Sequence, residues 1–223
     1  MPGLHVLRVF TNDEGEWGNR LGVFLDGAQV PEGDRQAIAA DLGFSETVFV
    51  EDPANGVLRI FTPALELPFA GHPLVGTGWL LDQQGGAGAV LRPPAGEVEM
   101  RVEGDSAWIV GRAEWSPPFE YLQLGSPAEV HALRGSQEGG FVYAWAWIDE
   151  DAGTVRARSF CPGAGIAEDE ATGSAALALC AQLGCPITVH QGHGSVLNAR
   201  PVEDRWVEVG GRVALDEVRE HSI

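Results

Sequence analysis

Most of the segments that carry a structural signal are short apolar stretches. They are rich in Val, Phe and Trp and are bounded by Gly, Pro and Asp, which is the pattern of short β-strands separated by turns. The expected strands are Leu4–Phe10, Leu21–Leu25, Thr47–Val50, Val57–Phe61, Ala107–Val110, Phe141–Ile148, Val155–Phe160 and Trp206–Val209.

Three other segments carry helical signals. In the first of them Ile38 and Leu42 lie four residues apart, so they would share one face of a helix. A glycine follows each segment and provides a C-terminal stop. The expected helices are Glu32–Leu42, Pro73 to about Gln83, and about Thr172 to Leu183.

The second and third helices begin in a related way. Gly71–Gly78 can be laid over Glu168–Ala175, and a strand ending in Phe-x-Pro precedes each, at Phe61–Pro63 and Phe160–Pro162. The chain is therefore interpreted as two copies of one strand-loop-helix plan. Because the identity between the copies is weak, true duplication and chance similarity stay equal alternatives at this point.

A boundary between the two copies is expected near Arg112–Pro118, in a proline-containing stretch that follows a strand. This would divide the chain into an N-terminal half, residues 1–113, and a C-terminal half, residues 114–223.

Composition narrows the possible functions. The formal net charge is −18, and all 14 basic residues are arginines that do not cluster, so neither nucleic acid nor an anionic membrane is an expected partner. The chain has no lysine, which excludes a Schiff base to pyridoxal phosphate or to a carbonyl substrate.

The cysteines and the start of the chain bear on its compartment. The three cysteines lack metal-binding spacing and do not suggest a disulfide framework, which favours a reducing, cytoplasmic location. No signal peptide or membrane span is recognised.

Two kinds of position could carry chemistry. The starts of the second and third helices would offer backbone amides and roughly half a positive charge each, enough to hold a substrate carboxylate. The alternative is simple helix capping, with Pro73 in the first turn and Asp169 near the other start. His190 and His193 flank Gly192, and this spacing favours a turn over a metal site, so no metal is expected.

Glu46 stands where a turn enters the apolar strand beginning at Thr47. Partial burial there would raise its carboxyl pKa toward the range used in general acid/base catalysis. The alternative is a solvated glutamate at the end of a strand.

Taken together, these residues resemble the PhzF-like family, named for phenazine biosynthesis, which has the diaminopimelate-epimerase fold. The stretches that carry the resemblance occur in family order over about the first 180 residues. They are Phe10–Thr11, Gly18–Asn19, Phe44–Val50, Pro68–Pro73, Gly76–Thr77, Arg158–Phe160, Glu168–Asp169 and Thr172–Ala175.

The resemblance implies an α+β fold of two pseudo-symmetric, strand-rich halves, each a barrel-like unit around a central helix, with the active site between them. It implies a cofactor-independent isomerase, a homodimer, and a small carboxylate-bearing substrate. By motif, Glu46 is the acid/base group, with His72 and Asp169 facing it as further catalytic residues. The implied substrate contacts are Ser45, Gly71, Gly173 and Ser174.

The chain departs from the family at several places. Arg20 and Glu170 stand where the family usually has proline, and Glu170 would place another acid beside Asp169 and alter what the pocket accepts. Diaminopimelate epimerase, a relative in fold, uses a thiol pair, whereas neither helix start here has a cysteine. A one-base shuttle is therefore favoured, with Cys161 expected to be a small buried side chain.

Two other functions stay open at this stage. One is an amino-acid epimerase or racemase, in which Glu46 is opposed by His72 or Asp169. The other is a non-catalytic binding protein on the same fold, which the intact acid/base residues argue against.

Overall fold

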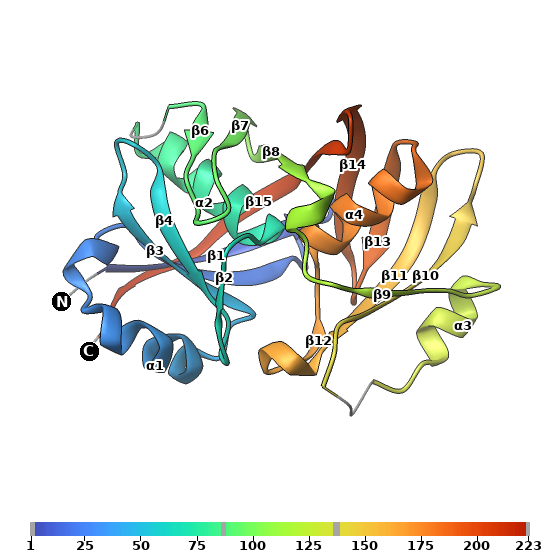
Figure 1. The fold of residues 1–223 in the computed structure, drawn as a ribbon, viewed down its shortest axis with the longest axis horizontal. Coiled ribbons are helices and arrows are strands. Elements are labelled where there is room, and N and C mark those ends of the chain that lie inside the picture. Colours follow the sequence, from blue (N-terminus) through green and yellow to red (C-terminus); the bar gives the residue numbers. More distant parts are fainter. Residues whose placement is uncertain (1–2, 86–87, 136–138, 222–223) are drawn as a thin grey trace.

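A computed structural model describes residues 3–85, 88–135 and 139–221. Two strand-rich lobes lie side by side, with helices α2 and α4 inside them and α1 and α3 at their edges (Figure 1). The four α-helices of the described residues are α1 (Glu32–Leu42), α2 (Gly71–Gln83), α3 (Pro127–Ala132) and α4 (Gly173–Leu183). Short 3-10 helices cover Gly27–Gln29, Ala113–Trp115 and Pro162–Ala164.

The strands of the described residues form one connected, mixed sheet. They are β1 (Gly3–Thr11), β2 (Asn19–Phe24), β3 (Glu46–Asp52), β4 (Val57–Phe61), β5 (Glu66–Leu67), β6 (Val90–Leu91), β7 (Val98–Glu103), β8 (Ser106–Arg112), β9 (Glu120–Gln123), β10 (Val142–Asp149), β11 (Thr154–Cys161), β12 (Ile166–Asp169), β13 (Ile187–Gln191), β14 (Ser195–Glu203) and β15 (Trp206–Glu220).

The predicted helices and strands are confirmed within a few residues at their ends, except that β15 continues far beyond the expected Trp206–Val209. The α+β fold class is confirmed. The sequence did not predict α3. It also did not predict seven strands that are short or polar, namely β5, β6, β7, β9, β12, β13 and β14. Among the described residues, no helix combines the length and hydrophobicity that crossing a membrane would require.

The first lobe closes into a barrel around α2. Its strands pair in the order β4, β3, β2, β1, β15, β8, β7 and β6. An isolated parallel bridge between Val57 and Arg92 then joins the start of β4 to the end of β6. The Arg92 amide also donates to the Gly56 carbonyl at 2.7 Å, so backbone bonds run all the way around the helix.

The second lobe repeats the same connections. In the first lobe α1 connects the parallel strands β2 and β3, and β3 then forms an antiparallel hairpin with β4. In the second lobe α3 connects the parallel strands β9 and β10, and β10 forms an antiparallel hairpin with β11. In each lobe a short strand then pairs with the hairpin, and the central helix comes next. The parallel bridge at Val57 corresponds to the parallel pairing of Thr154 with Thr188. This shared topology supports the internal duplication that the sequence left open.

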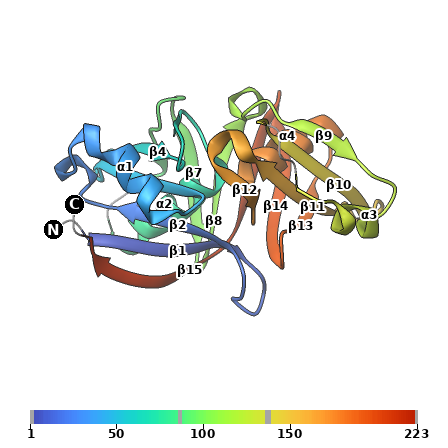
Figure 2. The ribbon, with the colours of Figure 1, turned by 90° about the horizontal axis from the view of Figure 1, so that it is seen from below.

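Strand β15 joins the two lobes, and it is much longer than the expected Trp206–Val209. Its first half lies between β14 and β8, and its second half runs beside β1, as Figure 2 shows for β1, β2 and β15. Gly210 and Gly211 let this strand pass close under aromatic rings. A Cβ at Gly210 would lie 2.2 Å from Trp108 Cδ1, and one at Gly211 would lie 2.9 Å from Phe10 Cδ1. In sequence β15 belongs to the predicted C-terminal half, residues 114–223, but its second half pairs with β1 of the first lobe. The division at residue 113 stays a prediction.

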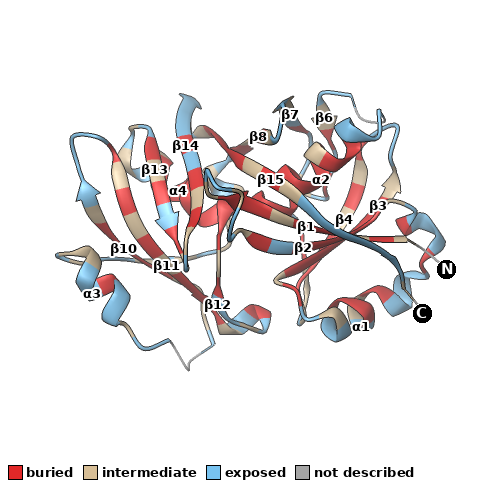
Figure 3. Cartoon of the chain, turned by 180° about the vertical axis from the view of Figure 1, so that it is seen from behind, coloured by how far each residue is buried: buried red, intermediate tan, exposed pale blue. Residues whose placement is uncertain are grey.

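The central helices are buried on nearly every side (Figure 3). Residues 71–78 of α2 and 173–180 of α4 are all buried, which is the pattern of helices inside a core. Gly76 and Gly78 permit this packing, since added Cβ atoms would lie 2.6 Å from Leu21 Cδ2 and 2.9 Å from Met100 Sδ. Close packing, and not ligand contact, therefore explains these two glycines.

The two helix starts touch each other. A Cβ built on Gly71 would lie 2.6 Å from the carbonyl carbon of Gly173, and one built on Gly173 would lie 2.9 Å from the backbone nitrogen of His72. Only glycine lets the two backbones approach this closely. The expectation that both helices open at one place in the molecule is thereby met.

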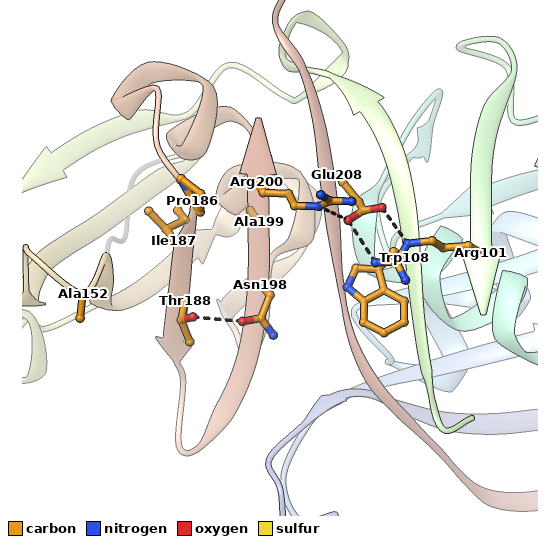
Figure 4. Close-up of a pocket in the computed structure, with 10 residues that line it drawn as sticks. All are labelled: Arg101, Trp108, Ala152, Pro186, Ile187, Thr188, Asn198, Ala199, Arg200 and Glu208. Carbon is orange, nitrogen blue, oxygen red and sulfur yellow. Dashed lines mark hydrogen bonds and ion pairs between the residues drawn. The ribbon is translucent and has the colours of Figure 1, made fainter. Parts of the chain in front are cut away.

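A hollow of about 310 Å³ is lined by residues of β7, β8, β13, β14 and β15 (Figure 4). Its floor is an ion-pair network in which Glu208, only 5% exposed, binds Arg101 Nε at 2.9 Å and Arg200 Nε at 2.6 Å. The Arg101 guanidinium lies 3.9 Å from the centre of the Trp108 ring. The hollow contains none of the predicted site residues, and the network braces β15 against its neighbours.

Replacing Glu208 with Gln should destabilise the fold. Burial alone would raise its pKa, but hydrogen bonds from Arg101 and Arg200 outweigh burial and lower the pKa of Glu208 to about 2. Stability from the ionised carboxylate is present above its unfolded pKa and is lost as pH falls toward about 2. Because both arginines are partly solvated, we expect a loss of about 1 kcal/mol at neutral pH.

Urea unfolding at several pH values measures this effect. The difference between wild type and the Glu208→Gln variant should shrink as the pH approaches the pKa of Glu208. A difference that stays constant with pH would show that the network does not stabilise the fold through its charge.

Candidate active site

Four buried polar side chains meet where the lobes join. Glu46 is the first residue of β3, His72 the second residue of α2, Asn19 the first residue of β2 and Asp169 the last residue of β12. They are 7%, 2%, 3% and 3% exposed, respectively. The first three come from the N-terminal half and the last from the C-terminal half.

Short distances connect these four residues. His72 Nδ1 lies 3.1 Å from Glu46 Oε2 and 3.5 Å from Asn19 Nδ2. The Asn19 amide donates to Asp169 Oδ1 at 2.6 Å and to the Ala171 carbonyl at 2.9 Å. The structure therefore brings together the three residues that the sequence predicted as catalytic, and it adds Asn19 between them.

Burial sets the ionisation of the group. Burial, with a smaller contribution from the Asp169 charge, raises the pKa of Glu46 well above its usual range. Burial also raises the pKa of Asp169, against hydrogen bonds from Thr172, Ser45 and Asn19 that act in the opposite direction. Burial lowers the pKa of His72 to about 3, so its imidazole is neutral at physiological pH. The His72–Glu46 contact is thus a contact of an uncharged imidazole with a carboxyl group that is hard to ionise.

Two atoms of this pair lack hydrogen-bond partners among the described residues. Glu46 Oε2 approaches His72 without hydrogen-bond geometry, and His72 Nε2 is also unpartnered. A buried polar atom without a hydrogen-bond partner destabilises the folded state, so its presence needs an explanation. A catalytic carboxyl group that must exchange a proton with a substrate supplies such a reason.

An outer network fixes Asp169, and the sequence analysis assigned no role to its members. Thr172 Oγ1 donates to Asp169 Oδ2 at 2.6 Å, and Gln191 Nε2 donates to Thr172 Oγ1 and to the Asp169 carbonyl, both at 2.9 Å. The Tyr143 hydroxyl donates to Gln191 Oε1 at 2.9 Å. Gln191 follows Ile187 and Val189 on the buried face of β13, where an apolar side chain would be expected. A polar residue at this alternating position was its only sequence signal.

The four predicted substrate contacts lie around the same centre. Ser45 Oγ donates to Asn19 Oδ1 at 3.1 Å, which places it beside the catalytic group. Gly71 and Gly173 form the backbone contact between the helix starts, and Ser174 is 5% exposed with its carbonyl accepting from Ser116. Their contact with a substrate stays a prediction.

The helix starts differ from the simple capping arrangement. Neither Ala70 before α2 nor Thr172 before α4 makes a side-chain capping bond, and Pro73 is the third residue of its helix. The Thr172 hydroxyl is turned to Asp169 instead. Helix starts without side-chain caps have backbone amides of the kind that bind anions.

Cys161 is buried near the site, 4% exposed, with its Sγ 3.4 Å from Ser159 Oγ. Burial, with the Asp169 charge as a smaller cause, raises the pKa of this thiol far above its usual range. A thiol in this state is neither a base nor a nucleophile at neutral pH.

Replacing Cys161 with Ala should therefore leave turnover within about twofold of wild type. The thiol stays protonated at neutral pH and takes no part in proton transfer. Steady-state kinetics of the purified variant measures this. A hundredfold loss with an unchanged melting temperature would assign chemistry to the thiol.

Both departures from the family pattern lie next to the site. The Arg20 guanidinium lies 4.8 Å from the centre of the Phe44 ring, and its side chain is exposed. The Glu170 carboxylate is directed to the turn between β13 and β14, where it meets His193. The sequence expectation placed this acid at the pocket, whereas the hydrogen bonds of its carboxylate are to the turn. Within the described part of the chain, His, Cys, Asp and Glu form no group of three suited to a metal ion.

Comparisons with known proteins bear on the family and fold of the chain. The family model for phenazine biosynthesis-like proteins, PhzC-PhzF, matches residues 7–139, more than half of the chain. The chain is 29% identical to the trans-2,3-dihydro-3-hydroxyanthranilate isomerase of Pseudomonas fluorescens, over 86% of this chain and 82% of that protein.

Solved structures extend the similarity to the fold. A predicted epimerase from Pseudomonas aeruginosa is 28% identical, with a TM-score of 0.79 over 99% of each chain. A phenazine biosynthesis PhzC/PhzF protein from Clostridium difficile is 20% identical, with a TM-score of 0.78 over 100% of each chain. At the lower identity the likeness concerns the fold alone.

Proposed function

The chain belongs to the PhzC-PhzF family of phenazine biosynthesis-like proteins and is an isomerase of that family. From this premise we propose that it moves a proton within a small carboxylate-bearing substrate, without a cofactor and with Glu46 as the single proton carrier. The observation that carries the proposal is the buried Glu46 carboxyl group, with a raised pKa and an oxygen that lacks a hydrogen-bond partner, in contact with a neutral His72.

The proposed reaction uses one carboxyl group twice. Ionised Glu46 takes a proton from a carbon next to an unsaturated or carbonyl-activated carbon, and the electron pair delocalises into the adjacent π-system. Glu46, now protonated, returns a proton to another carbon on the same face, and exchange of its carboxyl proton with solvent before this second step introduces deuterium when the reaction runs in D₂O. Because a raised pKa makes the carboxylate a stronger base, burial increases the driving force of the first step.

The neighbours of Glu46 would position it. Neutral imidazole has one donor and one acceptor nitrogen, so His72 can donate to the carboxylate or accept from the carboxylic acid, according to its tautomer. Asn19 binds Asp169 from the opposite half and lies within 3.5 Å of His72. Together they would hold the carboxyl group steady while the substrate changes around it.

The substrate carboxylate would bind at the touching helix starts. Gly71 and Gly173 bring the two N-termini into backbone contact, and neither has a side-chain cap. Each start contributes roughly half a positive charge. The site would therefore have a local positive potential in a chain that is otherwise strongly acidic. Gly173 and Ser174 would bind the substrate carboxylate through their backbone amides, and Ser45 would lie beside it as a further contact.

The name of the Pseudomonas fluorescens relative suggests the first substrate to test, trans-2,3-dihydro-3-hydroxyanthranilate. Incubation of the purified protein with this compound, followed by NMR in D₂O, tests the proposal. We expect conversion to an isomer of equal mass apart from deuterium. If neither this substrate nor analogous unsaturated carboxylates are converted, the proposed isomerase activity is contradicted.

We further propose that the protein is a homodimer in the cytoplasm. Sedimentation velocity would measure the oligomeric state.

A second candidate is an amino-acid epimerase, favoured by the similarity to the predicted epimerase from Pseudomonas aeruginosa. Two opposed bases need room for a carbon atom between them, and His72 and Glu46 are only 3.1 Å apart. Asp169 would then have to be the second base. Deuterium entering the α-position of an amino acid with inversion would favour this candidate over the isomerase.

A further inference from the structure

The Glu170 carboxylate is enclosed by the turn between β13 and β14. Its two oxygens accept from the His193 amide at 2.9 and 3.0 Å, and Oε1 also accepts from Ser195 Oγ at 2.8 Å. His193 Nδ1 lies 2.8 Å from Oε2, and the Gly194 amide lies 3.4 Å from Oε1. One side chain thus binds three consecutive residues of the turn.

The turn requires glycine at position 192. Gly192 has a positive φ of 58°, and a Cβ added to it would lie 2.2 Å from Glu170 Oε2. On its other side, Arg156 donates to the carbonyls of His190 and Gly192. The turn is therefore held through its amides by a carboxylate and through its carbonyls by a guanidinium.

The same turn reaches the other half of the molecule. The Gly18 amide donates to Ser195 Oγ at 3.1 Å, and the Trp17 ring stacks on the His193 ring with centroids 5.6 Å apart. A Cβ on Gly194 would lie 2.3 Å from Trp17 Cδ1, so the fit between the two segments is tight. Trp17 and Gly18 belong to the loop between β1 and β2, directly before Asn19.

Two bridges therefore connect the same two segments. The inner bridge is the bond from Asn19 to Asp169 inside the site. The outer bridge runs from Gly18 through Ser195 to Glu170, the residues adjacent to those of the inner bridge. Fixing Gly18 and Glu170 fixes the backbone on which Asn19 and Asp169 stand.

We propose that Glu170 is a positioning residue for the proton-transfer site. Its carboxylate holds the β13–β14 turn against the β1–β2 loop and so keeps Asn19 and Asp169 in register across the two halves. The catalytic consequence rests on the proposed function of Glu46, whereas the structural consequence does not. The acid that replaces the family's usual proline at this position thus gives this chain its own means of joining the halves.

The Glu170 charge also acts on Asp169 directly. A like charge nearby disfavours ionisation, and Glu170 accordingly contributes to the raised pKa of Asp169. The other titratable groups that interact with the Asp169 charge are Glu46, Tyr143 and Cys161. Neutralising Glu170 would leave those three unchanged and should lower the pKa of Asp169.

The test compares Glu170→Gln with Glu168→Gln in the full chain. Glu168 is a matched control because it lies on the same segment, two residues away, and pairs with Arg158 outside the site. Amide hydrogen exchange at His193 and Gly194 should become about tenfold faster or more in Glu170→Gln, since their charged acceptor is lost. A carbon-detected NMR titration should show a lower pKa for Asp169 in that variant. Neither readout should change in Glu168→Gln.

Kinetics add the catalytic arm. With trans-2,3-dihydro-3-hydroxyanthranilate, kcat should fall about ten- to a hundredfold in Glu170→Gln with a smaller change in KM, because misplaced groups raise the barrier more than they weaken binding. Unchanged exchange and an unchanged Asp169 titration would overturn the proposal even if wild type is inactive. Faster exchange with unaltered kcat would overturn the positioning role. Wild-type inactivity alone would count against the proposed function only.

Discussion

Replacing Glu46 with Gln should lower turnover by about a hundredfold to ten-thousandfold, the range typical of general acid/base catalysis. Glutamine keeps the size of the side chain and can still meet His72, but it cannot take or return a proton. Substrate binding should change little, since the proposed carboxylate site lies at the helix starts. Steady-state kinetics and ligand titration of the variant measure the two effects separately.

Thermal stability gives this variant an internal control. Because the folded-state pKa of Glu46 lies above its ordinary value of 4.5, stability from the neutral carboxyl group is fully present below that value. It is lost as the pH rises through the raised pKa. The Gln variant should therefore melt at the same temperature as wild type or higher near neutral pH. A variant that melts much lower would mean that lost turnover reflects unfolding.

Replacing Gly71 with Ala should have the largest effect on the architecture of the site. The new Cβ would lie 2.6 Å from the Gly173 carbonyl carbon and 2.7 Å from the Ser174 nitrogen. Backbone atoms cannot move aside as a flexible side chain can, so the two helix starts must separate. We expect a loss of about 2–3 kcal/mol in the free energy of unfolding and a fall in turnover of about a hundredfold.

Gly33→Ala is the matched control, because an added Cβ at this position in α1 meets no atom within 4 Å. That variant should be as stable as wild type or gain up to about 1 kcal/mol. Chemical denaturation of both variants, with kinetics on the folded fraction, separates the two effects. Equal stability and equal turnover in Gly71→Ala and wild type would show that the close approach of the helices is dispensable.

Local sequence patterns were enough to predict the strands that bear Glu46 and Asn19 and the helix that bears His72, but not β12, which bears Asp169. Ile38, Leu42 and Gly43 predicted α1, and the Phe-x-Pro strands with small residues after them predicted the starts of α2 and α4. Such signals are local, since each depends on residues only a few positions apart in the sequence. The Glu46 position followed from its place before an apolar strand together with the family resemblance.

Features that depend on contacts between distant residues were not predicted. The bond from Asn19 to Asp169 joins residues 150 positions apart, and no local pattern announces it. The expected strand Trp206–Val209 stopped short of Gly210 and Gly211, whereas β15 continues through these glycines, beside the Trp108 and Phe10 rings, to Glu220. Glu170 was expected at the pocket, whereas its partners at the β13–β14 turn draw its carboxylate to that turn.

The most direct test of the central claim is the entry of solvent deuterium into substrate and product, followed by NMR for wild type and Glu46→Gln side by side in D₂O. With trans-2,3-dihydro-3-hydroxyanthranilate as the probe, wild type should incorporate deuterium at the carbon that receives the proton. The Glu46→Gln variant should incorporate it at least about a hundredfold more slowly. Equal rates of incorporation in the two proteins would contradict the assignment of Glu46 as the proton carrier and leave His72 or Asp169 as the base.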